Sequence, residues 1–174
     1  IKINLARVFE VAFYELLDDT SAERSTAALW ARFELHLRRA VEATARCLDF
    51  HLEHQHQNMP ELVLDLCCYG PIEKGEDASH GGVEFTNLGI DGAALAVVAD
   101  SFAAIEQRLD VEKRLGWDEL RGHLESNWAG IDGERARLAM HSTPRYGTGG
   151  SLADRYAARI ARLFGDMINE KPTP

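Results

Sequence analysis

The 174-residue chain has few of the features that mark disulfide-rich, membrane-spanning or nucleic-acid-binding proteins. Its three cysteines, Cys47, Cys67 and Cys68, are too few and too unevenly spaced for a disulfide framework, so we expect a reducing, cytoplasmic location. Lys and Arg number 19 against 28 Asp and Glu, and this net charge of −9 argues against a nucleic-acid partner. The unbroken apolar run Ala93–Ala99 is far shorter than the roughly 20 residues of a membrane span. The first residues lack the features of a signal peptide.

Apolar residues recur at helical spacing through most of the chain, which indicates a mainly α protein with one domain over residues 1–174. Residues 72–82 are polar and rich in glycine, so we expect a loop there. Alternation over residues 83–87 predicts one short strand, the only strand that the pattern supports. The spacing predicts helices over residues 3–17, 26–57, 60–68, 93–109, 117–128, 133–142 and 151–167. We expect the short helix over residues 60–68 (PELVLDLCC) to be mostly buried.

The stretch from Ala93 to Ile105 is the most apolar helix, because only Asp100 and Ser101 are polar within it. A helix that is apolar on all sides must be covered by other elements, so we expect this helix to be the central core helix. Buried polar groups need partners, and we therefore expect Asp100 to be buried beside a hydrogen-bond donor. A structural role for Asp100 and Ser101 is favoured over a general-base role for the carboxylate.

Two clusters suggest ligand sites, and each also has a simpler interpretation. His51, His54 and His56, followed by Cys67 and Cys68, offer side chains that suit zinc. The histidines share a polar helix face with Glu and Gln, however, so a solvated face is favoured and no metal ligand is assigned.

The second cluster, Tyr146–Ser151, precedes a helix and resembles a phosphate-binding turn. It lacks the Lys-Ser/Thr pair of a P-loop, and a plain connection between helices is favoured.

Several blocks of the sequence resemble the glycyl radical enzyme family, which includes pyruvate formate-lyase and its dehydratase and lyase relatives. The resemblance extends over nearly the whole chain and rests on the order of the blocks. They are Asn4–Val8 (NLARV), Ile72–Asp77 (IEKGED) with Gly81, Gly82 and Phe85, Gly89–Gly92 (GIDG) with Ala99–Ile105 (ADSFAAI), and Pro144–Gly147 (PRYG).

This resemblance implies an anaerobic enzyme built on a ten-stranded α/β barrel, usually a homodimer. In the family, a glycyl radical passes to a cysteine, and the thiyl radical cleaves C–C, C–O or C–N bonds of a small-molecule substrate. A separate activating enzyme, which uses S-adenosylmethionine and an iron–sulfur cluster, installs the radical. Residues 1–174 would then be one helix-rich segment of a larger pyruvate formate-lyase-like domain, forming part of the helical wall of the barrel.

The sequence contains neither the family's Gly-Cys loop nor its glycyl radical loop, which we expect before Ile1 and after Pro174. We therefore expect an internal segment that is scaffold, without a catalytic residue or a directly bound cofactor. Ile1, Ile3 and Asn4 are the expected pocket-lining residues, because they lie nearest the Gly-Cys loop. The choice between acyltransferase and dehydratase or lyase stays open. A catalytically inactive helical interaction module and a metal-binding helical protein are the alternatives.

Overall fold

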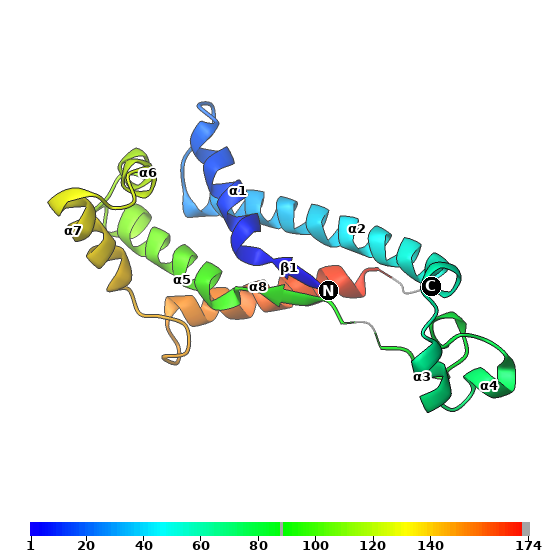
Figure 1. Cartoon of the computed structure of the whole chain (residues 1–174). Helices are drawn as coiled ribbons and strands as arrows, with labels where there is room; N and C mark the ends of the chain where they lie inside the picture. Colours follow the sequence, from blue (N-terminus) through cyan, green and yellow to red (C-terminus); the bar gives the residue numbers. More distant parts are fainter. Residues whose placement is uncertain (88, 172–174) are drawn as a thin grey trace.

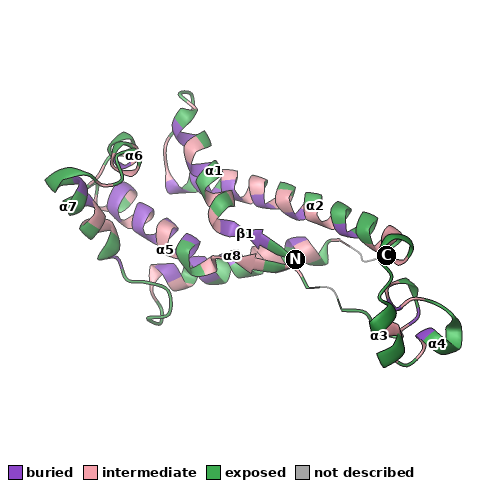
Figure 2. Cartoon of the chain, viewed as in Figure 1, coloured by how far each residue is buried: buried purple, intermediate pink, exposed green. Residues whose placement is uncertain are grey.

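The computed structural model describes residues 1–87 and 89–171, and four helices form the main body (Figure 1). Helix α1 packs along α2, and α5 packs along α8 and contacts α1. Apolar residues face inward on all four helices (Figure 2), as their spacing in the sequence predicts. These helices are α1 (Leu5–Asp18), α2 (Thr26–Asn58), α5 (Leu95–Ile105) and α8 (Leu152–Asn169).

Two short strands, β1 (Lys2–Asn4) and β2 (Asp91–Ala93), form a parallel pair in which Ile3 lies opposite Gly92. Each strand runs almost directly into a helix, β1 into α1 and β2 into α5 (Figure 1). A Cβ atom at Gly92 would lie 3.1 Å from Leu5 Cδ1, so glycine permits the close approach of β2 to α1. The chain thus contains two strand–helix units whose strands are neighbours.

The core is centred on Phe102 of α5, which is fully buried. Its ring lies 4.9 Å from that of Phe9, 5.3 Å from Trp30, 5.4 Å from Phe33 and 5.0 Å from Tyr156, measured between centroids. Aromatic pairs at these separations add to the stabilisation from burial alone. The helix predicted to be central therefore does occupy the centre of the core.

The remaining elements lie at opposite ends of the main body (Figure 1). One end lobe follows α2 and the other follows α5. The first lobe contains α3 (Leu62–Cys67), α4 (Pro71–Lys74) and the 3-10 helix η1 (Ala78–His80). The second contains the π-helical turn η2 (Glu106–Val111), α6 (Trp117–Glu125) and α7 (Gly130–His141).

Most predicted helices are confirmed within a few residues, but the predicted strand is wrong. Residues 83–87 form no strand, and Phe85 is 85% exposed. Strand β2 lies further along the chain, and its partner β1 occupies the start of the predicted helix over residues 3–17. Parallel pairing joins residues 89 positions apart, such as Ile3 and Gly92, which a local pattern cannot show. The loop predicted over residues 72–82 is partly helical: it contains most of α4 and all of η1.

Two expectations about burial are also wrong. Helix α3 was expected to be mostly buried, yet none of its residues is buried, because no described element covers its apolar face. Helix α5 was expected to be covered on all sides, yet the Val97 side chain is 58% exposed, since no described element packs over that face. None of the described helices is long and apolar enough to cross a bilayer.

Candidate functional site

The residues expected to line a substrate pocket lie at the strand pair. Ile3 is buried in the core, whereas Ile1 is 57% exposed. The backbone nitrogen of Ile1 donates to the carbonyl oxygen of Gly89 at 3.1 Å. The Asn4 side chain accepts from the backbone N–H of Arg7 at 3.1 Å and so caps α1. Ile3 and Asn4 thus lie on β1 and Ile1 directly precedes it, and their role in a substrate pocket stays a prediction.

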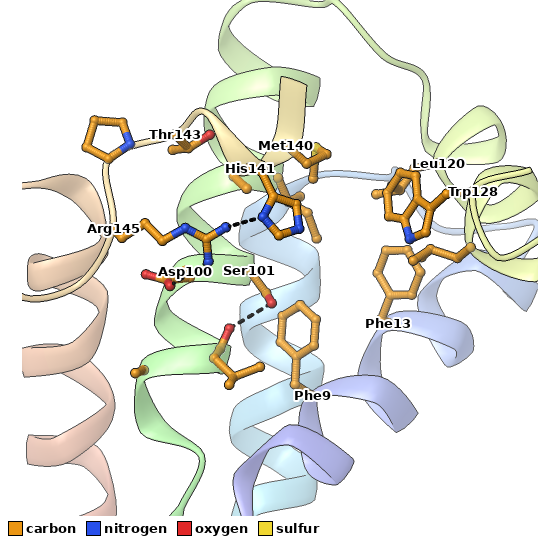
Figure 3. A pocket seen from close by; sticks show the side chains of 16 residues that line it. Phe9, Phe13, Asp100, Ser101, Leu120, Trp128, Met140, His141, Thr143 and Arg145 are labelled. Carbon is orange, nitrogen blue, oxygen red and sulfur yellow. Dashed lines mark hydrogen bonds and ion pairs between the residues drawn. The ribbon is translucent and has the colours of Figure 1, made fainter. Parts of the chain in front are cut away.

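A cavity of about 420 Å³ lies between α1, α5, α6, α7 and the turn that follows α7 (Figure 3). Its walls are apolar on the side of α1 and α6 and polar on the side of α7. Sixteen residues line it: Phe9, Phe13, Ala96, Val97, Asp100, Ser101, Ala104, Ile105, Leu120, Leu124, Trp128, Met140, His141, Thr143, Pro144 and Arg145.

Helical spacing brings the apolar side chains to this cavity. Phe9 and Phe13 are four residues apart on α1, and Leu120 and Leu124 are four residues apart on α6, so each pair shares one helix face. Trp128 follows α6 with a φ of 61°, which is unusual for a bulky residue, and its backbone N–H donates to the carbonyl oxygen of His123 at 2.7 Å. This turn directs the indole toward the cavity (Figure 3).

Gly133 of α7 packs against the backbone of this turn. A Cβ atom at Gly133 would lie 2.6 Å from the carbonyl carbon of Trp128, so no larger residue fits there without a shift of the backbone. Glycine at position 133 therefore lets α7 lie close enough to complete the cavity wall.

Asp100 and Arg145 form the polar side of the cavity. Asp100 accepts from the Arg145 guanidinium at 3.1 Å and from the backbone N–H of Tyr146 at 2.8 Å. The Asp100 side chain is 20% exposed, so the expectation that it is buried is wrong, while a donor does lie within hydrogen-bond distance. The reason is its place at the cavity, where α5 is not covered. Asp100 therefore ties the turn after α7 to α5.

The second Arg145 nitrogen lies 2.7 Å from His141 Nδ1 (Figure 3). Because a guanidinium can only donate, Nδ1 accepts, and a neutral His141 carries its proton on Nε2. Ser101 donates its hydroxyl to the carbonyl oxygen of Val97 at 2.8 Å, a bond within its own helix. The Thr143 side chain is buried, and its Oγ1 has no partner among the residues that the structure describes.

The sequence suggested two clusters as ligand sites, the histidines between His51 and His56 and the turn Tyr146–Ser151, and the structure forms neither site. His54 Nδ1 lies 2.9 Å from the Phe50 carbonyl oxygen, and His56 stacks on His80 at 3.7 Å. No group of three or more His, Cys, Asp or Glu side chains that could hold a metal occurs in residues 1–87 and 89–171.

In the turn before α8, the Asp154 carboxylate accepts from the backbone N–H groups of Gly147 at 2.7 Å and Ser151 at 3.0 Å. These bonds lower the pKa of Asp154 below its usual 3.8. A carboxylate therefore already occupies the N–H groups that a phosphate would need.

Sequence reasoning identified Asp100 and Ser101 as structural residues but missed the cavity around them. Arg145 was noted only as part of the PRYG block, and His141, Thr143 and Trp128 were not assigned to any site. These residues come together only when α6 and α7 fold back on α1 and α5, so no local signal marks them.

The comparison with known sequences covers the whole chain. The family described as pyruvate formate lyase-like matches residues 1–174. An isethionate sulfite-lyase of Desulfovibrio desulfuricans is 31% identical over 119 residues, 68% of this chain and 14% of that protein. A (2S)-3-sulfopropanediol dehydratase of Klebsiella oxytoca is 27% identical over 100 residues, 58% of this chain and 12% of that protein. The chain thus spans only a small part of the curated relatives it matches.

Solved structures share the fold of this chain at low sequence identity. A B12-independent glycerol dehydratase from Clostridium butyricum has a TM-score of 0.82 at 18% identity, covering 99% of this chain and 23% of that one. A glycyl radical enzyme from Archaeoglobus fulgidus has a TM-score of 0.79 at 24% identity, covering 97% and 22%. The mainly α architecture therefore corresponds to a segment of the fold of these enzymes. Together these findings show that the chain belongs to the pyruvate formate lyase-like family of glycyl radical enzymes.

Proposed function

We propose that this chain is a scaffold segment of a glycyl radical enzyme that acts as a dehydratase or lyase. The observation that carries this proposal is the parallel pair of β1 and β2, with α1 following one strand and α5 the other. Parallel strands with helices packed on them are the building units of α/β barrels. The family match over residues 1–174 supports the enzyme class.

The names of the two curated relatives favour dehydratase or lyase chemistry over acyl transfer. One is a sulfite-lyase that is named for isethionate and the other a dehydratase that is named for sulfopropanediol. Both names denote small molecules that carry a sulfonate and a hydroxyl group. We therefore propose a small hydroxyalkane sulfonate or polyol as the substrate of the whole protein.

The scaffold role is supported by the apolar surface of the first end lobe. Leu62 is 66% exposed, Val63 78%, Leu66 74% and Tyr69 97%. A concentration of exposed apolar side chains of this kind marks a surface that packs against protein. We propose that further parts of the barrel cover it, and that the whole protein is a cytoplasmic homodimer served by a separate radical-activating enzyme.

The test uses the natural protein that contains this sequence, incubated without oxygen with a matching activating enzyme, S-adenosylmethionine and a reductant. We expect a glycyl radical doublet in electron paramagnetic resonance and loss of isethionate, (2S)-3-sulfopropanediol or glycerol. The 174-residue chain alone, treated identically, should give neither signal. Coenzyme A-dependent cleavage of pyruvate would instead support the acyltransferase alternative. Absence of the doublet, while the same activating enzyme activates a known partner, would support the inactive interaction module.

A further inference from the structure

We propose that the cavity between α1, α5, α6 and α7 is a binding site for an uncharged aromatic molecule that carries one hydroxyl group. A molecule of the size of a naphthol or a hydroxyindole suits this cavity. This inference rests on the cavity itself and does not depend on the proposed radical chemistry.

The volume and the apolar walls set the size and hydrophobicity of the ligand. Small-molecule sites span about 300–1,000 Å³ and are lined mainly by apolar side chains with a few polar groups. The cavity of about 420 Å³ falls within that range, and eleven of its sixteen lining residues are apolar. An apolar cavity of about 150 Å³ can hold one benzene ring, so a two-ring molecule fits here.

The side chains in the walls favour an aromatic ligand. The rings of Phe9 and Phe13 lie nearly parallel, 6.3 Å apart at an interplanar angle of 12°, and both border the cavity. Trp128 adds an indole, and Met140 adds a thioether (Figure 3). Aromatic rings gain from edge and offset contacts with other rings, and thioethers contact ring edges favourably.

The electrostatics favour a neutral ligand. Among the described residues that line the cavity, only Asp100 and Arg145 carry a permanent charge, and they pair with one another at 3.1 Å. A charged ligand would meet one attractive and one repulsive member of this pair, so the pair offers it little net stabilisation. An uncharged molecule leaves this pair intact, so it avoids the cost of separating the charges.

The polar groups favour a hydroxyl on the ligand, because a hydroxyl both donates and accepts. His141 presents an Nε2–H donor, since its Nδ1 already accepts from Arg145. Ser101 retains acceptor capacity on its oxygen. Both groups belong to residues that line the cavity.

Within the described part of the chain, no element covers the face of α5 at the mouth of the cavity. Ala96 and Val97 line the cavity, and both are exposed. A larger side chain at position 96 should therefore obstruct the opening without disturbing the core.

The experiment measures binding of three matched probes, 2-naphthol, naphthalene and 2-naphthoate, to the 174-residue chain and to the natural protein containing it. Isothermal titration calorimetry or ligand-observed NMR reports the dissociation constants. We expect saturable 1:1 binding of 2-naphthol. One net hydrogen bond corresponds to about a threefold to tenfold effect, so naphthalene should bind weaker by that factor and 2-naphthoate more weakly still.

Two variants and two matched controls test the location. Ala96→Trp should weaken 2-naphthol binding at least about tenfold, whereas Ala161→Trp, at an exposed position of α8 outside the cavity, should leave it unchanged. Ser101→Ala removes the acceptor and should narrow the difference in affinity between 2-naphthol and naphthalene, leaving the part that the His141 Nε2–H donor supplies. Thr26→Val, which removes a hydroxyl elsewhere, should keep the full difference.

Three results would overturn the proposal: equal affinity for 2-naphthol and 2-naphthoate, undiminished binding to the folded Ala96→Trp variant, or binding to the short chain but not to the natural protein. The last result would mean that protein side chains fill the cavity in the natural protein. Circular dichroism confirms that each variant is folded, and if Ala96→Trp is not, an undiminished preference of Ser101→Ala for 2-naphthol overturns the proposal.

Discussion

Replacing Asp100 by alanine should destabilise the chain because this carboxylate connects α5 to the turn after α7. Its bond to the Tyr146 backbone N–H, at 2.8 Å, is a hydrogen bond to a charged acceptor, which contributes about 1.5–3 kcal/mol. Since the Asp100 side chain is 20% exposed, we use the lower value. The Arg145 side chain is 46% exposed, so the ion pair adds only about 0.5 kcal/mol.

The expected loss for Asp100→Ala is therefore about 2 kcal/mol in the free energy of unfolding, which corresponds to a decrease of roughly 4–8 °C in Tm for a chain of this size. Urea unfolding followed by circular dichroism measures the first quantity and a thermal scan the second. Asp100→Asn should lose less, about 1 kcal/mol, because its amide oxygen can still accept from Tyr146. Ser101→Ala is the neighbouring control and should change stability by less than about 0.5 kcal/mol, since its hydroxyl bonds only within α5.

A double-mutant cycle separates the two contributions. Combining Asp100→Ala with Arg145→Ala should give a coupling energy of about 0.5 kcal/mol, which leaves most of the Asp100 effect to the backbone N–H. If Asp100→Ala costs less than about 0.5 kcal/mol, or Arg145→Ala costs as much as Asp100→Ala, the assignment of Asp100 as the connecting residue is wrong.

Three further predictions concern single positions. Ala94 has a φ of 70°, a conformation that glycine adopts without strain. Ala94→Gly should therefore raise the free energy of unfolding by about 1 kcal/mol, measured as a higher midpoint in urea unfolding. Thr143→Val should stabilise the chain by up to about 1 kcal/mol in the same assay, since the buried Oγ1 has no partner in the described residues. The pKa of Asp154 is lowered in the folded chain, so its contribution is present above pH 3.8 and is lost as the pH falls through the folded pKa. In urea unfolding between pH 3 and 7, the stability difference between wild type and Asp154→Asn should therefore be constant near neutrality and shrink at the acid end.

The sequence predicts the helices of this fold well because their information is local. In α2, Phe33, Leu37 and Val41 recur every four residues, and all three are buried against the other helices. The same reasoning identifies α5 as the central helix, with Phe102 at the middle of the aromatic core. Each of these patterns lies within one helix and does not depend on which element covers it.

The strands and the cavity could not be predicted in this way. Three residues, as in β1 or β2, are too few to show an alternation, and the pairing of Ile3 with Gly92 is fixed by packing between distant helices. The cavity likewise depends on where α6 and α7 lie relative to α1. The sequence shows that Trp128 and Met140 are apolar residues, but it does not show that both of them line the same cavity.

The first end lobe shows why an apolar pattern need not mean burial. Helix α3 has six residues, too short to be stable alone, and no buried side chain supports it. Polar bonds hold it instead: Asp65 accepts from the Ala78 backbone N–H at 2.7 Å, and Asp77 accepts from that of Glu61 at 2.7 Å. Hydrogen bonds from the Ser79 side chain and from backbone N–H groups lower the pKa of Asp77, so the lobe relies on the ionised Asp77 carboxylate. Because these bonds fix the backbone while no described element covers the apolar face, that face is free to pack against further protein, as the proposed scaffold role requires.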